Sequence, residues 1–355
     1  MNFLKAYKLI TGPMEYNLYR MRNKSKLLQF CLSLTDSCNS RCIMCNTWKK
    51  HIDNPELKKS EFKLKDMELL LKNSELKHLK NVSLSGGEPF LRKDIVEIAR
   101  LIHDYHSHVT FLSPSNCFLT KKVVQKAKEI ARFADLTICV SMDGIGDLHD
   151  KIRRVPNGFQ KLMKTVKELH EAGISLTWSF TIMPENQYEL EKVFKFSEPF
   201  ADSFSCRPMG EGFYFGTKGK HDKLDVEALS GQLKKINDPK NPMNFFIHGV
   251  RKFLGGKRML QCGAGYFSCL ITPQFDVFPC THCPAEWKFG NLKESGYSME
   301  KILDSETAKG VRREFVDKCK SCINEIEYPA TYVTQHSKMV LWNLFNRGSN
   351  IETEK

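Results

Sequence analysis

The sequence lacks any apolar run close to the roughly 18 residues that an α-helix needs to cross a bilayer, which excludes an integral membrane protein. Its first 26 residues are too polar and basic for a secretory signal, so we expect a cytoplasmic protein. Internal repeats and low-complexity segments are missing too. Hydrophobic residues fill 41% of the 355 positions, which suffices for a sizeable core and excludes a disordered chain.

Acidic residues are comparatively scarce: 41 Asp and Glu stand against 54 Lys and Arg, a net charge of +13. A basic surface can bind the phosphates of nucleic acid. The lysines, however, form solvated helix faces, as at Lys121, Lys122, Lys126 and Lys128, and no RNA-binding motif is present. We therefore expect no nucleic-acid partner and favour an acidic or phosphorylated small-molecule substrate, either sugar-linked or lipid-linked.

Cysteine, by contrast, is abundant, with 13 residues. Cytoplasmic proteins keep their thiols reduced, so metal ligation or catalysis explains these residues better than a disulfide framework. One group lies between positions 38 and 45, and a second is spread over the last hundred residues. Cys31, Cys139 and Cys206 fall in strand-like runs and are expected to be core residues.

From Leu27 onward, strand-like and helix-like runs alternate, which predicts a parallel sheet with helices outside it. Six such units are too few for a closed eight-stranded barrel. The expected fold class is therefore α/β, a partial (β/α)6 barrel followed by a small α+β Cys-rich module. The predicted strands are Leu28–Leu34, Asn81–Leu84, Val109–Leu112, Leu136–Met142, Ser175–Met183 and Ser203–Cys206. The predicted domains are an N-terminal basic amphipathic arm (1–27), the barrel (28–215), a linker with a helix (216–258), the Cys-rich module (259–335) and a tail (336–355).

The N-terminal arm alternates basic and apolar residues and is interrupted by Gly12-Pro13, as in a short amphipathic helix. Such a helix either packs against its own domain or makes a peripheral membrane contact. Only 27 residues precede the first predicted strand, so we expect no fused winged helix for peptide recognition.

Cys38, Cys42 and Cys45 form a CxxxCxxC motif in the loop after the first predicted strand. In parallel α/β folds, ligands collect at the carboxyl ends of the strands. Three thiolates at these spacings can bind three irons of a cubane cluster and leave the fourth iron open. A zinc site would need a fourth ligand, which His51 could supply.

Further motifs follow the next strands, and together with the cysteines they resemble the radical S-adenosylmethionine (SAM) superfamily over roughly residues 28 to 210. The three cysteines match the family's cluster motif, and Met44 stands where a side chain packs near the adenine. The segment Ser85-Gly86-Gly87-Glu88-Pro89 resembles the motif that holds the methionyl amino group. Its glycines allow a close backbone approach, and its carboxylate can accept a hydrogen bond from an ammonium.

Two later segments extend this resemblance. Ser115-Asn116 stands where the family often has Thr-Asn-Gly. Ser141 and Asp143, followed by Arg153-Arg154, resemble the family's strand-four serine and the arginine that pairs with the SAM carboxylate, which a guanidinium binds in bidentate fashion. Which of the two arginines serves is left open by the sequence.

The resemblance implies a [4Fe–4S] cluster whose open iron binds SAM, and a flavodoxin- or ferredoxin-type electron donor. Reductive cleavage of SAM then gives a 5′-deoxyadenosyl radical that removes a hydrogen atom from the substrate. The protein orients the substrate and excludes quenchers.

A second cysteine pattern follows, with Cys262 and Cys280 separated by 17 residues and a later CxxC formed by Cys319 and Cys322. A hairpin over Leu270–Phe278 and a helix over Ser298–Val316 are predicted between them. The pattern resembles the twitch module, a short relative of the SPASM domain, and implies one auxiliary [4Fe–4S] cluster on these four thiolates. The spacing of Cys280, Cys283, Cys319 and Cys322 also fits a zinc ribbon, which we disfavour beside a radical SAM core.

An auxiliary cluster without an open iron suggests an electron acceptor, so we expect a radical SAM oxidoreductase that dehydrogenates its substrate. Glu211, Tyr214 and Asp276 are candidates for the catalytic base near the junction of barrel and module. The alternative is modification of a peptide substrate, by thioether formation or epimerisation, together with a separate recognition protein.

Overall fold

A computed structural model describes residues 14–210, 212–216, 224–238, 240–241, 243–258 and 262–323. Within them, nine strands form one sheet in the order β6-β5-β4-β3-β2-β1-β7-β8-β9. The first six are β1 (Gln29–Ser33), β2 (Asn81–Ser85), β3 (Thr110–Ser115), β4 (Leu136–Ser141), β5 (Ser175–Ile182) and β6 (Ser203–Pro208). Each of these pairs in parallel with the next, which confirms the predicted partial barrel.

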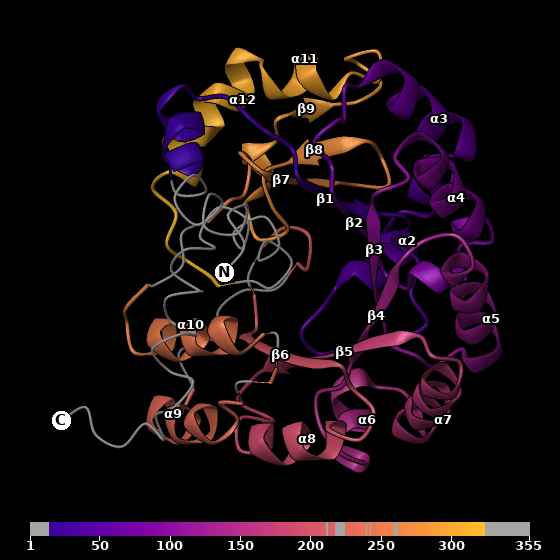
Figure 1. The fold of residues 1–355 in the computed structure, drawn as a ribbon, viewed down its shortest axis with the longest axis vertical. Helices are drawn as coiled ribbons and strands as arrows, with labels where there is room; N and C mark the ends of the chain where they lie inside the picture. The colour runs from indigo at the N-terminus through magenta and orange to yellow at the C-terminus, as the bar shows by residue number, and fades with distance from the viewer. Residues whose placement is uncertain are drawn as a thin grey trace, which may run out of the picture.

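Helices cover the outer face of this curved sheet (Figure 1). They are α3 (Leu64–Asn73), α4 (Ile95–Tyr105), α5 (Thr120–Ala131), α6 (Asp147–Arg153), α7 (Gly158–Glu171) and α8 (Leu190–Ser197), and a short α2 (Lys50–Asp53) follows the cysteine loop. Helix α4 illustrates why these helices pack on the sheet. Its apolar residues recur at helical spacing and are fully buried: Ile95, Ile98, Ala99 and Ile102. Truncating one of these isoleucines to alanine costs about 2–5 kcal/mol.

The predicted linker is more structured than expected. It contains α9 (Val226–Lys235) and α10 (Asn244–Leu254), which pack on each other, and α10 also packs on β6. Helix α10 buries Phe245, Phe246 and Val250, so it closes the β6 edge of the barrel with apolar contacts.

The Cys-rich module extends the sheet at its other edge. Its strands are β7 (Ser268–Ile271), β8 (Asp276–Phe278) and β9 (Gly290–Asn291). β7 pairs in parallel with β1, and β7 and β8 form the predicted antiparallel hairpin. The single helix predicted near residues 298–316 is instead α11 (Met299–Leu303), α12 (Glu306–Val311) and a short π-helix over Arg312–Val316. The break arises because Ser305 begins α12 as an N-cap that accepts from the amide of Ala308.

The described part of the N-terminal arm, a helix over residues 14–21, packs on this module. Tyr16 is buried and stacks on Phe267 at 5.8 Å. Arg20 pairs with Asp317 at 2.7 Å. The arm therefore contacts its own chain, one of the two arrangements that the sequence left open. Among the described residues, none of the helices combines the length and the apolar character needed to cross a membrane.

Candidate active site inside the partial barrel

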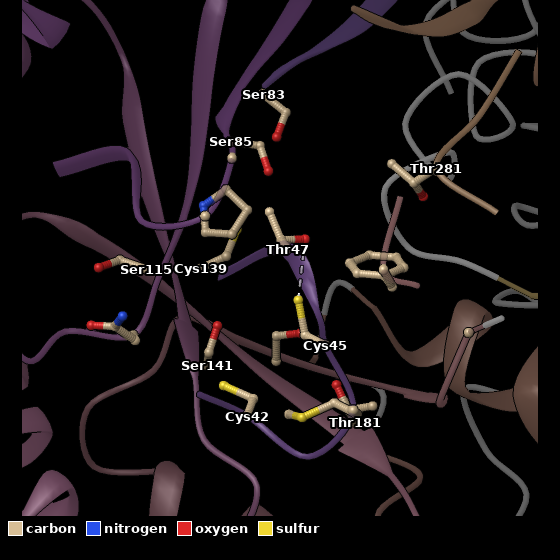
Figure 2. A pocket seen from close by; sticks show the side chains of 18 of the residues that line it. Cys42, Cys45, Thr47, Ser83, Ser85, Ser115, Cys139, Ser141, Thr181 and Thr281 are labelled. Carbon is tan, nitrogen blue, oxygen red and sulfur yellow. Dashed lines mark hydrogen bonds between the residues drawn. The ribbon is translucent and has the colours of Figure 1, made fainter. Parts of the chain in front are cut away.

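A cavity of about 290 Å³ lies inside the barrel. It is lined by the loop after β1, by β2 to β6, and by a loop of the Cys-rich module. In Figure 2, Ser83 and Ser85 lie at the top of the view, Ser115 and Cys139 on the left, Ser141 and Cys42 below them, and Thr281 on the side opposite Ser115. The sequence placed Cys139 in the core, but the structure places it in this cavity wall.

The three cysteines of the CxxxCxxC motif all line this cavity. The Cys42 sulfur lies 3.0 Å from the Ser40 hydroxyl and 3.6 Å from Nη1 of Arg153. The Cys45 thiol contacts Oγ1 of Thr47 at 3.3 Å. Burial raises the pKa of Cys38 and Cys45. A cation such as iron, which binds the thiolate, opposes this effect of burial.

His51, the alternative fourth ligand, contacts other groups. Its Nδ1 lies 2.8 Å from the Ser37 hydroxyl, and its Nε2 lies 3.1 Å from a carboxylate oxygen of Glu61. No three His, Cys, Asp or Glu side chains in the described ranges converge as the ligands of a single ion would.

Gly86 and Gly87 pack directly on the backbone of the cysteine loop. A Cβ at Gly86 would lie 2.5 Å from the carbonyl oxygen of Thr35, and one at Gly87 would lie 2.3 Å from that of Ser37. The Gly87 amide donates to Thr35 at 2.7 Å. Glycine is therefore required here for close backbone packing, and both residues, with Ser85, line the cavity.

Glu88 is buried and holds neighbouring segments together. Its carboxylate accepts from the Ser115 hydroxyl at 3.0 Å and from the Asn116 amide at 2.9 Å. Burial raises the pKa of Glu88 to about 7. Ser115 and Asn116 face the cavity, whereas Glu88 and the buried Pro89 are not among its lining residues. In this structure Glu88 acts through the residues that it positions.

Asp143 and Arg153 form a buried ion pair with 2.5 Å between Oδ2 and Nη2. Asp143 also accepts from the Thr181 amide at 2.8 Å. Arg153 lines the cavity, as does Ser141, whereas Arg154 is exposed at the end of α6. The structure therefore favours Arg153 for a SAM carboxylate. Within the described residues, the buried Nε of Arg153 has no hydrogen-bond partner, so a donor remains for such a group.

The three candidate bases differ in their positions. Tyr214 lines the cavity and its hydroxyl lies 2.9 Å from that of Ser33. Burial raises the pKa of Tyr214 well above its ordinary value, so it stays protonated at neutral pH. Asp276 is outside the cavity, where it binds Lys288 and Asn291 in the β8–β9 hairpin. Glu211 lies outside the described residues.

The sequence did not single out the inward faces of β5 and β6. Thr177, Ser179 and Thr181 on β5 and Ser205 and Arg207 on β6 line the cavity. They alternate with buried apolar residues, so the period-2 pattern could have found them. Met44 lines the cavity as well, beside Met209 in an apolar cluster.

None of the four predicted auxiliary cysteines lines this cavity. Cys280 and Cys283 are buried in an apolar cluster that includes Tyr214, and Cys262 packs against that cluster. Cys262 and Cys319 line a second cavity of about 570 Å³, and Cys322 lines a third of about 260 Å³. Phe253 is common to both. Cys262, Cys319 and Cys322 line these two cavities, and together with Cys280 they have the donor set of a [4Fe–4S] cluster. The Cys283 thiol donates to the carbonyl oxygen of Cys280 at 3.2 Å.

Comparison with known proteins finds a matching family for the barrel and another for the Cys-rich module. The Radical SAM superfamily matches residues 32–197, and the SPASM iron–sulfur cluster-binding domain matches residues 262–323. An AdoMet-dependent heme synthase of Methanosarcina barkeri is 24% identical over 82% of this chain and 88% of its own length. The subtilosin biosynthesis protein AlbA of Bacillus subtilis is 25% identical over 78% of this chain, which spans 60% of that relative.

Solved structures share the fold at low identity. Streptococcus suis SuiB bound to S-adenosylmethionine has a TM-score of 0.64 at 17% identity, covering 84% of this chain and 71% of its own. A structure of anSMEcpe with AdoMet and a peptide has a TM-score of 0.61 at 16% identity, and the match covers 90% of this chain and 99% of that structure's chain.

These matches explain both cysteine groups. A radical SAM domain uses SAM and a [4Fe–4S] cluster, and a SPASM domain binds auxiliary iron–sulfur clusters. Fold, cavity and both matched models agree: the chain carries a radical SAM domain over residues 32–197 and a SPASM-type iron–sulfur module over residues 262–323.

Proposed function

We propose that this enzyme removes a hydrogen atom from a substrate C–H bond and that the substrate then passes one electron to the auxiliary cluster. The substrate also releases a proton to water, so that it loses two electrons and two protons in total. A single observation carries this proposal. Thr281 lines the barrel cavity, and the preceding residue, Cys280, is a predicted ligand of the auxiliary cluster.

The residues of the cavity have distinct parts in this proposal. Cys38, Cys42 and Cys45 hold the first cluster, and Arg153, held by Asp143, binds the SAM carboxylate. When bound, SAM and its cluster supply the 5′-deoxyadenosyl radical after one electron arrives from a flavodoxin- or ferredoxin-type donor. Met44 lies in an apolar cluster with Cys42 and Met209, which forms an apolar wall beside the cysteine loop.

The described residues that line the cavity include no Asp, Glu, His or Lys, so none of the usual side chains is there to accept the substrate's proton. The protonated Tyr214 can orient the substrate through its hydroxyl, together with Ser33. The substrate's proton therefore goes to water in this scheme.

A peptide substrate is the second candidate, because two relatives act in peptide biosynthesis or maturation. They are AlbA and the sporulation killing factor maturation protein SkfB of Bacillus subtilis. A cavity of about 290 Å³ is at the lower end of the range for ligand sites, so it suits one side chain of a peptide and not a longer segment.

Isotope transfer distinguishes the two candidates. The reconstituted enzyme is incubated anaerobically with SAM, reductant and extracts of fully deuterated cells, divided into a small-molecule filtrate and a peptide fraction. Deuterium in 5′-deoxyadenosine reports hydrogen abstraction from the substrate in that fraction. We expect it from the filtrate, with one 5′-deoxyadenosine formed per substrate oxidised. Deuterium from the peptide fraction alone would favour peptide modification.

A further inference from the structure

We propose that the helix over residues 14–21 docks this protein on an anionic membrane surface through three outward side chains, Met14, Leu18 and Met21. They are 67%, 42% and 85% exposed, respectively. Because they follow one another at intervals of four and three residues, they share one side of the helix. These three side chains are called the apolar stripe below.

Exposed apolar side chains are concentrated on this helix. The described residues expose eight large apolar side chains, and three of the eight belong to this short segment. Single exposed apolar residues are normal on protein surfaces, whereas a contiguous group indicates contact with an apolar partner. The apolar stripe is such a group, unlike the scattered Ile52 and Tyr188.

The opposite side of the helix is anchored to the SPASM-type module. Tyr16 stacks on Phe267 at 5.8 Å, and its hydroxyl donates to the carbonyl oxygen of Cys262 at 3.0 Å. Nε of Arg20 donates to the carboxylate of Asp317 at 2.9 Å. At 3.6 residues per turn, Tyr16 and Arg20 lie across the helix from the apolar stripe. Turning the stripe inward would break these contacts, so it stays on the outside.

Positive charge adjoins the apolar stripe. Arg22 and Lys24 follow the helix directly and are exposed, and neither side chain pairs with a carboxylate of the described residues. The first 26 residues contain six Lys or Arg and a single acidic residue, Glu15, which pairs with Lys26. Apolar side chains can enter the acyl boundary of a bilayer while neighbouring cations meet the lipid phosphates. The combination therefore fits a surface of anionic lipids.

A membrane suits this face better than a second protein. A stable protein interface buries about 800 Å² on each partner, which is more than three side chains supply. A bilayer needs no complementary shape, because the stripe only has to enter its boundary layer. In Figure 1 the indigo helix lies at the outer edge of the molecule beside α12, where Asn23 donates to the carbonyl oxygen of Lys309 at 3.0 Å. A flat surface can meet the helix at such an edge.

Co-sedimentation of the whole, anaerobically reconstituted chain with lipid vesicles tests this proposal. The probes are vesicles of phosphatidylcholine alone and vesicles of phosphatidylcholine and phosphatidylglycerol in equal parts. We expect the wild type to bind the anionic vesicles at least tenfold more tightly than the neutral ones. That preference should be largely lost at about 1 M salt, where screening acts over about 3 Å.

Two variants separate the apolar and the charged contributions. The stripe variant, Met14→Ser with Leu18→Ser and Met21→Ser, should bind the anionic vesicles at least tenfold more weakly than the wild type. Arg22→Gln with Lys24→Gln should weaken the same binding several-fold and reduce its dependence on salt.

Two further variants are matched controls. Ile52→Ser with Tyr105→Ser and Val226→Ser removes three exposed apolar side chains that lie outside the helix. Lys121→Gln with Lys122→Gln removes two exposed charges from α5. Both should bind the anionic vesicles within twofold of the wild type, with the same iron content and melting temperature.

The possible results lead to distinct conclusions. If the wild type does not bind anionic vesicles, or if the stripe variant binds them as tightly, the proposal is overturned. Equal binding to neutral and anionic vesicles overturns the claim for an anionic surface. A wild-type dimer in analytical ultracentrifugation that the stripe variant loses would assign the stripe to a second copy of this chain instead. Should the stripe variant unfold, Met21→Ser alone decides at the most exposed position, with an expected loss of about threefold.

Discussion

Gly210 packs against the imidazole of His282 so closely that a Cβ on the glycine would lie 1.6 Å from Nε2. Gly210 follows β6 and lines the barrel cavity, while His282 stands between Thr281 and Cys283. Gly212 packs on the same loop, because a Cβ on this glycine would lie 2.7 Å from the Cα of His282. The end of the barrel and the loop of the auxiliary cysteines are therefore fitted to each other through glycine.

Gly210→Ala should displace this loop and weaken the auxiliary site. We expect the iron content to fall from about eight per chain toward four, because Cys280 belongs to the displaced segment. Gly231→Ala on α9 is the matched control, since its Cβ meets nothing within 4 Å. Iron analysis after reconstitution is the measurement, and full iron content in Gly210→Ala would show that the loop tolerates the shift.

Asp143→Asn should lower SAM affinity at least tenfold and destabilise the fold by about 3–5 kcal/mol, because it leaves the buried guanidinium of Arg153 without its counter-ion. Arg154→Gln should change neither quantity much, since that side chain is exposed. Equilibrium binding of SAM and thermal unfolding measure the two effects. Equal losses in both variants would contradict the assignment of Arg153.

Glu88 gives the protein a defined pH dependence. Burial raises the pKa of Glu88 from 4.5 to about 7, so the folded state holds this proton more tightly than the unfolded chain. Folding stability should therefore fall as the pH rises from 4.5 to 7, by up to about 1.4 kcal/mol per pH unit, and level off above 7. Melting temperatures of the wild type and Glu88→Gln between about pH 4.5 and 8 test this. The loss should be absent from Glu88→Gln, and parallel curves would contradict it.

Arg312 joins the N-terminal segment to the SPASM-type module. Its fully buried guanidinium donates to Asn23, Ser25, Gly265 and Leu303. Arg312→Ala should cost about 3 kcal/mol or more, because it removes charge-assisted hydrogen bonds and leaves buried acceptors.

Limited trypsin digestion measures this effect directly. Cleavage after Arg20 or Arg22 should accelerate in Arg312→Ala, since the segment would detach from the module. Arg313→Ala is the matched control, because the neighbouring arginine is exposed. Unchanged cleavage in both variants would mean that other contacts hold the segment.

The sequence predicted the six barrel strands because their apolar runs and the intervening helical periods are local signals. It also predicted that Cys38, Gly86 and Ser115 gather at one end of the sheet, since parallel strands bring their carboxyl ends together. It could not predict that β7 adds to the barrel beside β1, because that pairing joins segments more than 200 residues apart.

Two features of the site also depend on tertiary structure. The hydrogen bond from the Asn116 amide to Glu88 and the burial that raises the pKa of Tyr214 both depend on the fold. The period-2 pattern of β6 predicts which side of the sheet Arg207 lies on. It does not reveal whether that side is packed with side chains or lines a cavity. The break between α11 and α12 depends on one serine cap, which a helical period over the whole segment obscures.

The central claim is that two four-iron sites serve two different steps, and iron counting in paired cysteine variants tests it most directly. The reconstituted wild type should hold about eight irons and no zinc. Cys42→Ala should abolish 5′-deoxyadenosine formation, whereas Cys280→Ala should keep about four irons and still form 5′-deoxyadenosine. About four irons and one zinc in the wild type, or SAM cleavage by Cys42→Ala, would contradict the account.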